Sequence, residues 1–479
     1  MLLRYSALYL LARGVPGLVN FFAIAIYTRM LSPEEYGRYA LVVAGVGLFD
    51  VIFFQWLRLS LLRFLPAYLS DPKDLLSSVL AGFVSVAFLT GVLGVLAAAV
   101  WPDPSLRGLL LVAIPLLWAQ AWFELNLEMA RSRLRPERYG MMSGIKAVSA
   151  LVLGVAAVFW GLGAEGPLFG LLVGFLIASF LYGRSEWQGI IPKWSSGFMK
   201  TLVGYGLPLT ATFALSFVVS SSDRFLIAWF LGEGAAGVYS ASYNLVQQSL
   251  TLLMMVVNVA AYPLAARALE SKGEEAARKQ LLKNAELLFG VAFPGTLGLI
   301  TLAPNIAAIL LGTEFQKEAS QLIPLVAVAA LLSGIRAYHF DLAFQLGQRT
   351  VGQVWVMGGA AAINLLLNCW WIPRYGPLGA AWSTMVAYAV ALLLSANLGR
   401  KIFFIPIEWR SVAKLTIATA AMIPILLAGR IAGTTLAWVG AGVGATFVYG
   451  ASLLLLDAGG LRFKLIKLLG MFRRHRHES

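Results

Sequence analysis

The chain has 479 residues, of which 59% are hydrophobic and 13% are charged, and its mean hydropathy is +0.78. Soluble domains average about 45–50% apolar and about 25% charged residues, so this composition excludes a water-soluble globule. The net charge of +14 is typical of basic cytoplasmic loops in membrane proteins. Because no basic motif interleaved with aromatic residues occurs, nucleic acid is not expected as a partner.

The apolar runs predict fourteen transmembrane helices, since each span needs roughly 20 apolar residues. The first run, from Tyr5 to Met30, is too long for the apolar core of a secretory signal and is interpreted as the first span. The predicted helices lie near residues 6–29, 39–62, 76–100, 107–130, 140–161, 164–183, 201–231, 236–264, 284–311, 321–346, 351–372, 377–399, 412–430 and 434–456.

The basic residues indicate the orientation of these helices. With both termini in the cytoplasm, 27 of the 37 Lys and Arg residues fall in inside segments, 6 fall outside and 4 lie within spans. This asymmetry agrees with the positive-inside rule, and removing one helix would destroy it. The basic tail 457–479 is interpreted either as an amphipathic segment on anionic lipid or as an ordinary stop after the last span.

An internal duplication predicts two pseudo-symmetric lobes. Gly166-Pro167-Leu168 opens the sixth predicted helix and Gly376-Pro377-Leu378 opens the twelfth, at an offset of 210 residues. Six helices separate the two triplets, so the repeats would share one orientation, and transporters of this design hold their substrate between the halves. The predicted organisation is an N-lobe of six helices (1–183), a cytoplasmic linker (184–200), a C-lobe of six helices (201–400), two further helices (401–456) and the tail.

Three segments carry a resemblance to a known family. They are TRMLSPEEYGRYAL (Thr28–Leu41), YGLPLTATFALSFVVSSSDRFLIAWFLGEGAAGVYSASYNL (Tyr205–Leu245) and the stretch from Pro294 through Gly312 to Phe315. In their order and helix context they resemble the polysaccharide-export and O-antigen flippases. That family belongs to the multidrug/oligosaccharidyl-lipid/polysaccharide exporter superfamily, together with the multidrug and toxin extrusion (MATE) antiporters and the lipid II flippase.

The resemblance implies an all-α polytopic fold with two six-helix lobes around a V-shaped cavity. It also implies a bacterial inner-membrane flippase that moves a polyprenyl-diphosphate-linked oligosaccharide to the outer leaflet by alternating access. The expected partners are this lipid-linked substrate, membrane lipids, H⁺ or Na⁺ as a coupling ion, and polysaccharide polymerase machinery. Fourteen helices rather than twelve resemble the lipid II flippase, which leaves the subfamily open.

Charged residues within the predicted spans are the candidate site residues, because charge inside a bilayer usually faces a cavity or a partner. Arginine binds phosphate oxygens bidentately and stays charged in a dry site. The predicted diphosphate-binding residues are therefore the four arginines within spans, Arg13, Arg58, Arg224 and Arg336. The alternative is local pairing, since Asp223 directly precedes Arg224 and Asp50 shares a helix with Arg58.

The acidic residues and one histidine form a second candidate group, for gating or ion coupling. Its members are Asp50, Glu124, Glu128, Asp223, His339 and Asp341. Glu124 and Glu128 share a helix face, and the 210-residue offset aligns their region with Gly334–Asp341. Interfacial ion pairing, for example between Glu128 and Arg131, is the alternative interpretation.

The sequence also bears on functions other than that of a flippase. No metal site or cofactor is predicted, and no GxxxxGK[ST] loop is present to bind nucleotide. A membrane enzyme is not expected, because HExxH, GxSxG and DxD motifs are absent and the outer loops are short. A multidrug/cation antiporter remains an alternative because Asp50 and Glu124 would suit a cationic substrate, and a lipid II flippase is a further alternative.

Overall fold

All fourteen predicted helices are present in the computed structural model, which describes residues 2–100, 104–349, 351–432 and 434–457. Side chains are described for these residues except 2–13, 104–106, 259 and 260. The helices of the first half are α1 (Leu2–Met30), α2 (Pro33–Phe64), α3 (Lys73–Val100), α4 (Pro104–Ser132), α5 (Pro136–Phe159), α6 (Glu165–Gly183), α7 (Ser196–Leu231) and α8 (Glu233–Val246). Those of the second half are α9 (Leu252–Thr301), α10 (Ala303–Leu310), α11 (Thr313–Ile335), α12 (Leu342–Leu346), α13 (Val351–Tyr375), α14 (Pro377–Arg400), α15 (Trp409–Ala420), α16 (Ile423–Ala432) and α17 (Thr435–Leu455). The short segments η1 (Leu65–Tyr68), η2 (Arg184–Glu186), η3 (Gln247–Thr251) and η4 (Arg336–Phe340) link some of them.

The number of spans agrees with the prediction once α9 is divided. Among the described residues, twelve stretches are long and apolar enough to cross a membrane, and α1 is not one of the twelve. One of them is the 69-residue stretch Glu233–Thr301, which Gly273 interrupts with a non-helical backbone (φ 79°). Two spans in that stretch, together with α1, bring the total to fourteen.

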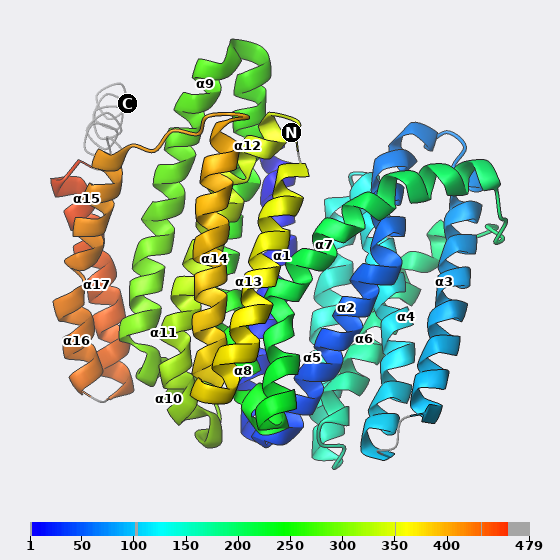
Figure 1. Ribbon diagram of the computed structural model, residues 1–479, viewed down its shortest axis with the longest axis horizontal. Coiled ribbons are helices and arrows are strands. Elements are labelled where there is room, and N and C mark those ends of the chain that lie inside the picture. The colour runs from blue at the N-terminus through cyan, green and yellow to red at the C-terminus, as the bar shows by residue number, and fades with distance from the viewer. Residues whose placement is uncertain (1, 101–103, 350, 433, 458–479) are drawn as a thin grey trace, which may run out of the picture. The chain divides into compact units, whose positions relative to one another are not determined.

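The loop predicted at 265–283 is instead helical. Figure 1 shows the two arms of α9 extending to a sharp bend at the top of the view. This segment is rich in Ala, Glu, Lys and Arg, which favour helix, and the pairs Glu274–Arg278 (2.7 Å) and Glu275–Lys279 (2.8 Å) add i,i+4 support. The sequence placed both spans correctly, but the helical extension between them was missed.

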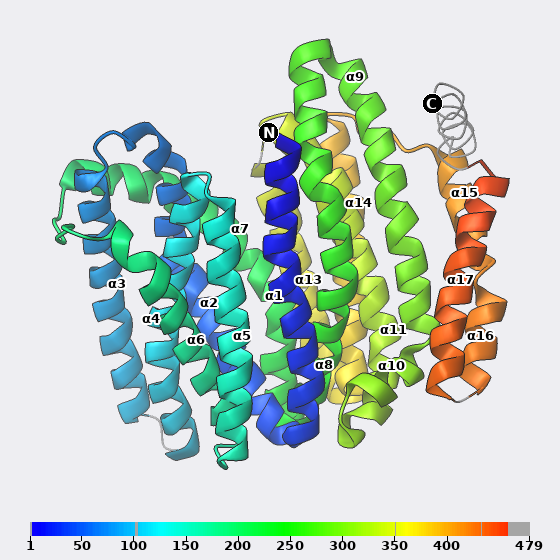
Figure 2. The same cartoon turned by 180° about the vertical axis from the view of Figure 1, so that it is seen from behind.

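The chain divides into two compact units: Met1–Asn244 with Met357–Ser383, and Leu245–Val356 with Thr384–Ser479. In the first unit α5 packs against α6 and α1, and α2 packs against α4 and α7 (Figures 1 and 2). In the second unit α11 packs against α9, and the C-terminal helices α15, α16 and α17 form a group beside α9. The predicted lobe boundaries at 183 and 200 stay a prediction, and the tail beyond Asp457 lies outside the described residues.

Both Gly-Pro-Leu triplets lie at helix starts, as the duplication predicted, at the beginning of α6 and of α14. In α6 the following glycine explains the tight packing on α5. A Cβ atom on Gly170 would overlap the Ala150 carbonyl oxygen and the Gly154 backbone. Small residues of this kind let helix backbones approach closely in a membrane, where packing drives helix association.

The first turns of α2 and α8 contact each other through their backbones. A Cβ atom on Gly37 would overlap the Glu233 carbonyl oxygen, and one on Gly237 would overlap that of Pro33. The Arg38 Nε atom lies 2.6 Å from Glu233 Oε2, which joins the same two turns. The start of α2 is further stabilised because Ser32 and Glu35 form a capping box.

We expect Gly37→Ala to destabilise the first unit by about 1–3 kcal/mol, because the added methyl group must displace backbone rather than a flexible side chain. Gly45→Ala is the matched control on the same helix, since nothing lies within 4 Å of the added Cβ there. Thermal unfolding in detergent should lower the Tm for Gly37→Ala and leave it equal or higher for Gly45→Ala. Equal Tm values for the two variants would contradict a tight α2–α8 contact.

Candidate functional site

Arg58 on α2 lies between the carboxylates of Asp50 and Glu124, which were both predicted as site residues. Its Nη2 atom is 2.8 Å from Asp50 Oδ2, and its Nη1 atom is 3.8 Å from Glu124 Oε2 on α4. Arg58 also hydrogen-bonds to the side-chain oxygen of Gln55, one turn before it on α2. The side chains of Arg58 and Asp50 are 8% and 4% exposed, whereas that of Glu124 is 37% exposed. The buried ion pair therefore lies within α2, and the packing of α4 against α2 places one accessible acid, Glu124, at its edge.

This pairing has a direct electrostatic consequence. Asp50 neutralises Arg58 inside a span, which is the local-pairing alternative considered above for this arginine. The Arg58 Nε–H has no hydrogen-bond partner among the described residues although it is buried, so the guanidinium keeps one free donor. A buried pair of this kind is costly to break, because removing one partner leaves an uncompensated charge.

Glu128 lies one turn beyond Glu124 and forms an ion pair within α4. Its Oε1 atom is 3.4 Å from Arg131 Nη1 on the same helix. Lys146 on α5 lies over the Phe175 ring, with its Nζ atom 4.7 Å from the ring centroid. The acids of α4 are therefore balanced by basic residues of the same unit.

Arg224 on α7 is held by neutral groups. Its Nη2 atom donates to Asn244 Oδ1 at 2.7 Å, and its guanidinium carbon lies 5.3 Å from the centre of the Tyr243 ring. Among the residues that the structure describes, no carboxylate oxygen lies within 4.0 Å of Arg224, and its buried Nε–H has no acceptor. Arg224 is only 9% exposed, so it is a buried guanidinium without an anionic partner in the described part of the chain.

The side chain of Asp223, the residue before Arg224, belongs to a separate polar network. It is 0% exposed and accepts hydrogen bonds from Tyr239 Oη (2.5 Å) and Asn368 Nδ2 (2.6 Å). Asn368 also donates to Asn364 Oδ1 at 3.0 Å, and that oxygen accepts from Ser222 at 3.2 Å. The network brings α7, α8 and α13 together around one buried carboxylate and several neutral oxygens.

The third group of predicted residues lies in the second unit, at the end of α11. Arg336 Nη1 is 3.4 Å from Asp341 Oδ2, and Asp341 also accepts from Ser395 Oγ at 2.6 Å. His339 is 1% exposed, and its ring stands edge-on to that of Phe289 at 5.9 Å. Arg336 and Asp341 are thus brought together, and His339 packs among aromatic rings beside them.

The structure leaves Arg13 untested. Its backbone belongs to α1, but its side chain lies outside the described residues. For the other site residues the structure gives partners, while their roles stay predictions. No group of three or more His, Cys, Asp or Glu side chains with metal-binding geometry occurs within the described ranges.

The sequence reasoning missed several residues of these clusters. Asn364 and Asn368 are four residues apart in an otherwise apolar run, and two asparagines on one helix face were a usable signal. Asn244 and Tyr239 gave no such signal, because α8 carries several Ser, Tyr and Asn side chains and the sequence does not indicate which of them has a partner on another helix. Their roles follow from the way α8 packs in the first unit.

Comparison with known proteins identifies the family. The family model described as "Polysaccharide biosynthesis protein" matches residues 26–320, which is more than half of the chain. The chain belongs to this family. A protein of Shigella flexneri assigned as an O-antigen transporter is 21% identical over 416 residues, which cover 82% of this chain and 96% of that protein. This confirms the family expected from the three sequence segments.

Solved structures show the same fold. The lipid II flippase MurJ in an inward closed conformation matches with a TM-score of 0.75 and 14% identity, covering 94% of this chain and 99% of that one. An inward-facing MATE transporter matches with a TM-score of 0.61 and 14% identity, covering 85% and 99%. The chain is therefore an all-α, multi-pass membrane protein with the two-lobed fold of this exporter superfamily. Its family is one of transporters rather than catalysts.

Proposed function

We propose that this protein is a flippase that moves a polyprenyl-diphosphate-linked oligosaccharide across the membrane by alternating access. The observation that carries the proposal is Arg224, a guanidinium buried in a span whose partners among the described residues are neutral. Charged side chains buried inside a membrane span usually mark a substrate-binding site or an ion pathway. Its free Nε–H suits an anionic head group, since guanidinium donors match phosphate oxygens.

The diphosphate also fits the energetics of export. Each negative charge moved outward across a membrane with a negative interior gains about 2.3 kcal/mol per 100 mV. The membrane potential could therefore contribute to export without nucleotide hydrolysis. In this mechanism the prenyl tail stays in the bilayer, and only the charged head group and glycan pass through the protein.

The contact between α2 and α8 supports alternating access. Its residues belong to the predicted N-lobe (Gly37, Arg38) and to the predicted C-lobe (Glu233, Gly237), so the contact would close one side of the pathway. Opening that side requires breaking the Arg38–Glu233 ion pair and separating the backbones of α2 and α8 at Gly37 and Gly237, where the glycines have no side chains to interdigitate. We place this closure on the outer face, as the distribution of basic residues predicts.

Ion coupling is assigned to the Asp223 network. A buried carboxylate surrounded by amide and hydroxyl oxygens of Asn364, Asn368 and Ser222 provides the hard oxygen ligands that Na⁺ or a proton would need. Asn368 Oδ1 is buried and has no hydrogen-bond donor among the described residues. A cation bound there would contact the Asp223 carboxylate and couple its movement to that of the substrate.

The cellular setting belongs to the same proposal. We infer an inner-membrane protein of a bacterium with both termini in the cytoplasm, because the basic residues cluster on that side of the predicted spans. A polysaccharide polymerase that uses the exported repeat unit is the expected functional partner. Neither a cofactor nor a catalytic step enters this mechanism.

Reconstitution in liposomes tests the proposed function. We expect proteoliposomes with a fluorescent prenyl-diphosphate oligosaccharide in both leaflets to lose more signal to an impermeant quencher than protein-free liposomes do. Transport should respond to an imposed Na⁺ or H⁺ gradient, and Asp223→Asn should remove that response. Accumulation of a cationic drug without any scrambling of the lipid would instead support the multidrug antiporter, for which the accessible Glu124 beside Arg58 is the specific observation.

A further inference from the structure

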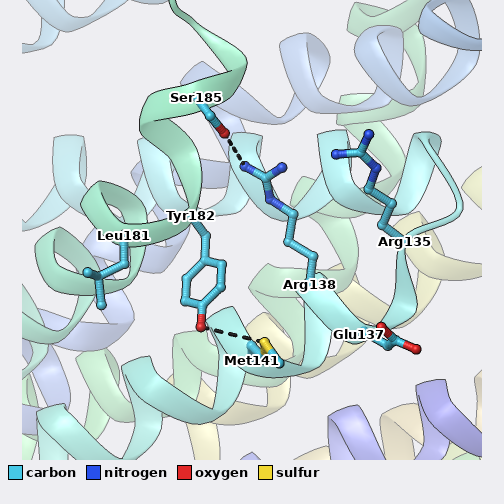
Figure 3. A pocket seen from close by; sticks show the side chains of 7 residues that line it. All are labelled: Arg135, Glu137, Arg138, Met141, Leu181, Tyr182 and Ser185. Atoms are coloured by element: carbon cyan, nitrogen blue, oxygen red, sulfur yellow. Dashed lines mark hydrogen bonds between the residues drawn. The ribbon is translucent and has the colours of Figure 1, made fainter.

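A pocket lies between the start of α5 and the end of α6, away from the clusters described above. It has a volume of about 370 Å³ and is lined by Arg135, Glu137, Arg138, Met141, Leu181, Tyr182 and Ser185. Leu181, Tyr182 and Met141 lie near one another, with the Tyr182 hydroxyl donating to Met141 Sδ at 3.5 Å, and the guanidinium groups of Arg135 and Arg138 lie further along the pocket (Figure 3). Nothing in the proposed transport step uses this pocket.

The basic side of the pocket is built around one acid. Glu186 of η2 is 8% exposed and accepts from three arginines: Arg133 at 2.5 Å, Arg135 at 3.2 Å, and Arg138. Glu186 and the lining residue Glu137 together offset two of these three charges, so one net positive charge remains at the pocket. Arg138 also donates to Ser185 Oγ at 3.3 Å, which fixes its guanidinium at the rim. Glu137, the acid that lines the pocket itself, points away from the two guanidinium groups in Figure 3.

The segment that carries Glu186 is itself held in place. Trp187 Nε1 donates to Asn126 Oδ1 at 2.9 Å, and its ring lies 4.8 Å from that of Trp122. Both partners are on α4, so α4, α5 and η2 together position the arginines. The positive side of the pocket is therefore built by packing and does not consist of freely moving surface side chains.

Apolar side chains lead away from the pocket along two helices. On α5 the exposed residues Met141, Val148 and Val152 share one face. On α6 the exposed residues Phe169, Leu176 and Phe180 do the same, with Phe180 one residue before the pocket-lining Leu181. In a membrane protein such faces contact acyl chains, so the pocket is at the point where a lipid tail would meet its head group.

We propose that this pocket binds the phosphate group of an anionic membrane lipid. Arg135, whose side chain is 53% exposed, and Arg138 hold the phosphate oxygens. Ser185 offers a hydroxyl group beside Arg138, and the acyl chains follow the exposed faces of α5 and α6. This site is separate from the transported substrate and does not depend on its identity.

Native mass spectrometry of the full-length protein tests the proposal, after incubation with dioleoylphosphatidylglycerol or dioleoylphosphatidylcholine. We expect the wild type to retain phosphatidylglycerol preferentially. The Arg135→Gln/Arg138→Gln variant should lower that retention at least roughly tenfold, as expected for two arginines at an anionic lipid surface. Arg63→Gln is the matched control, since Arg63 is an exposed arginine in the last turn of α2, outside the pocket lining.

A second variant keeps the test valid if the double variant fails to fold. Arg135→Gln alone changes a half-exposed side chain and should lower phosphatidylglycerol retention at least about twofold. Retention that is equal in the wild type, the pocket variants and Arg63→Gln would overturn the proposal. Arginine-dependent binding of inorganic diphosphate, with no retention of either lipid, would also overturn it, since the ligand would then be a soluble phosphate.

Discussion

Arg224→Gln is expected to lower glycan export by roughly 10- to 100-fold, since a hydrogen bond to a charged group contributes about 1.5–3 kcal/mol. Glutamine keeps a donor for Asn244 Oδ1 but removes the positive charge. Because Arg224 has no carboxylate within 4.0 Å among the described residues, its removal leaves no buried acid unpaired, and the protein should fold normally. Export is measured by surface display of the glycan in a strain that depends on the gene, at matched protein levels.

The control for Arg224 is a charge-preserving substitution. Arg224→Lys keeps the charge but loses the planar, bidentate donor geometry, so export should be intermediate between wild type and Arg224→Gln. Arg107→Gln, at an exposed arginine near the start of α4, should not change export. Full export by Arg224→Gln would show that this arginine has only a packing role and would remove the main support for an anionic substrate.

Arg58→Ala is expected to abolish export and to destabilise the protein by about 3–5 kcal/mol, because it leaves Asp50 buried without its partner. The double variant Asp50→Asn/Arg58→Gln removes both charges, keeps the side-chain size at residue 50, and shortens the side chain at residue 58 less than alanine does. We expect it to recover most of the thermal stability while export stays low, because the guanidinium next to Glu124 is still missing. Thermal unfolding and surface glycan are measured on the same set of variants.

The two readouts separate a structural from a functional role of Arg58. If stability and export recover together in the double variant, the pair only compensates a buried acid, and Arg58 does not contact the substrate. Asp50→Asn and Arg58→Gln as single variants complete the cycle with the double variant. Asp50→Asn frees Arg58 from its carboxylate, so export should persist if the guanidinium acts on the substrate. The interaction free energy of the pair follows from the four stabilities.

Periodicity and composition were sufficient for the helices but not for their extensions. The apolar runs located each span because a bilayer demands about 20 apolar residues whatever the tertiary structure. The helical arms of α9 around Gly273 were missed because charged residues between spans look like a loop. Local helix propensity and i,i+4 pairs continue the helix there, and neither depends on the membrane.

The sequence predicted which residues belong to the candidate site, but it did not predict which residues they pair with. Arg58 and Asp50 were chosen because charges within spans are rare, and the structure adds that they neutralise each other. Asp223 and Arg224 are neighbours in the chain, yet their side chains engage different partners, Asn368 and Asn244. Adjacent residues on a helix point about 100° apart, so sequence adjacency did not predict a pair.

The sequence alone determined the membrane class, the fourteen spans, the paired Gly-Pro-Leu helix starts and the family, because these depend on local composition and short motifs. Only the tertiary structure decided which charges lie beside an opposite charge, as Glu124 does beside Arg58, and which have no carboxylate nearby in the described part of the chain, as with Arg224. It also decided that Glu186 gathers three arginines beside a pocket. The physical reason is that pairing over tens of residues depends on which helix faces pack together, and hydrophobic periodicity does not specify that choice.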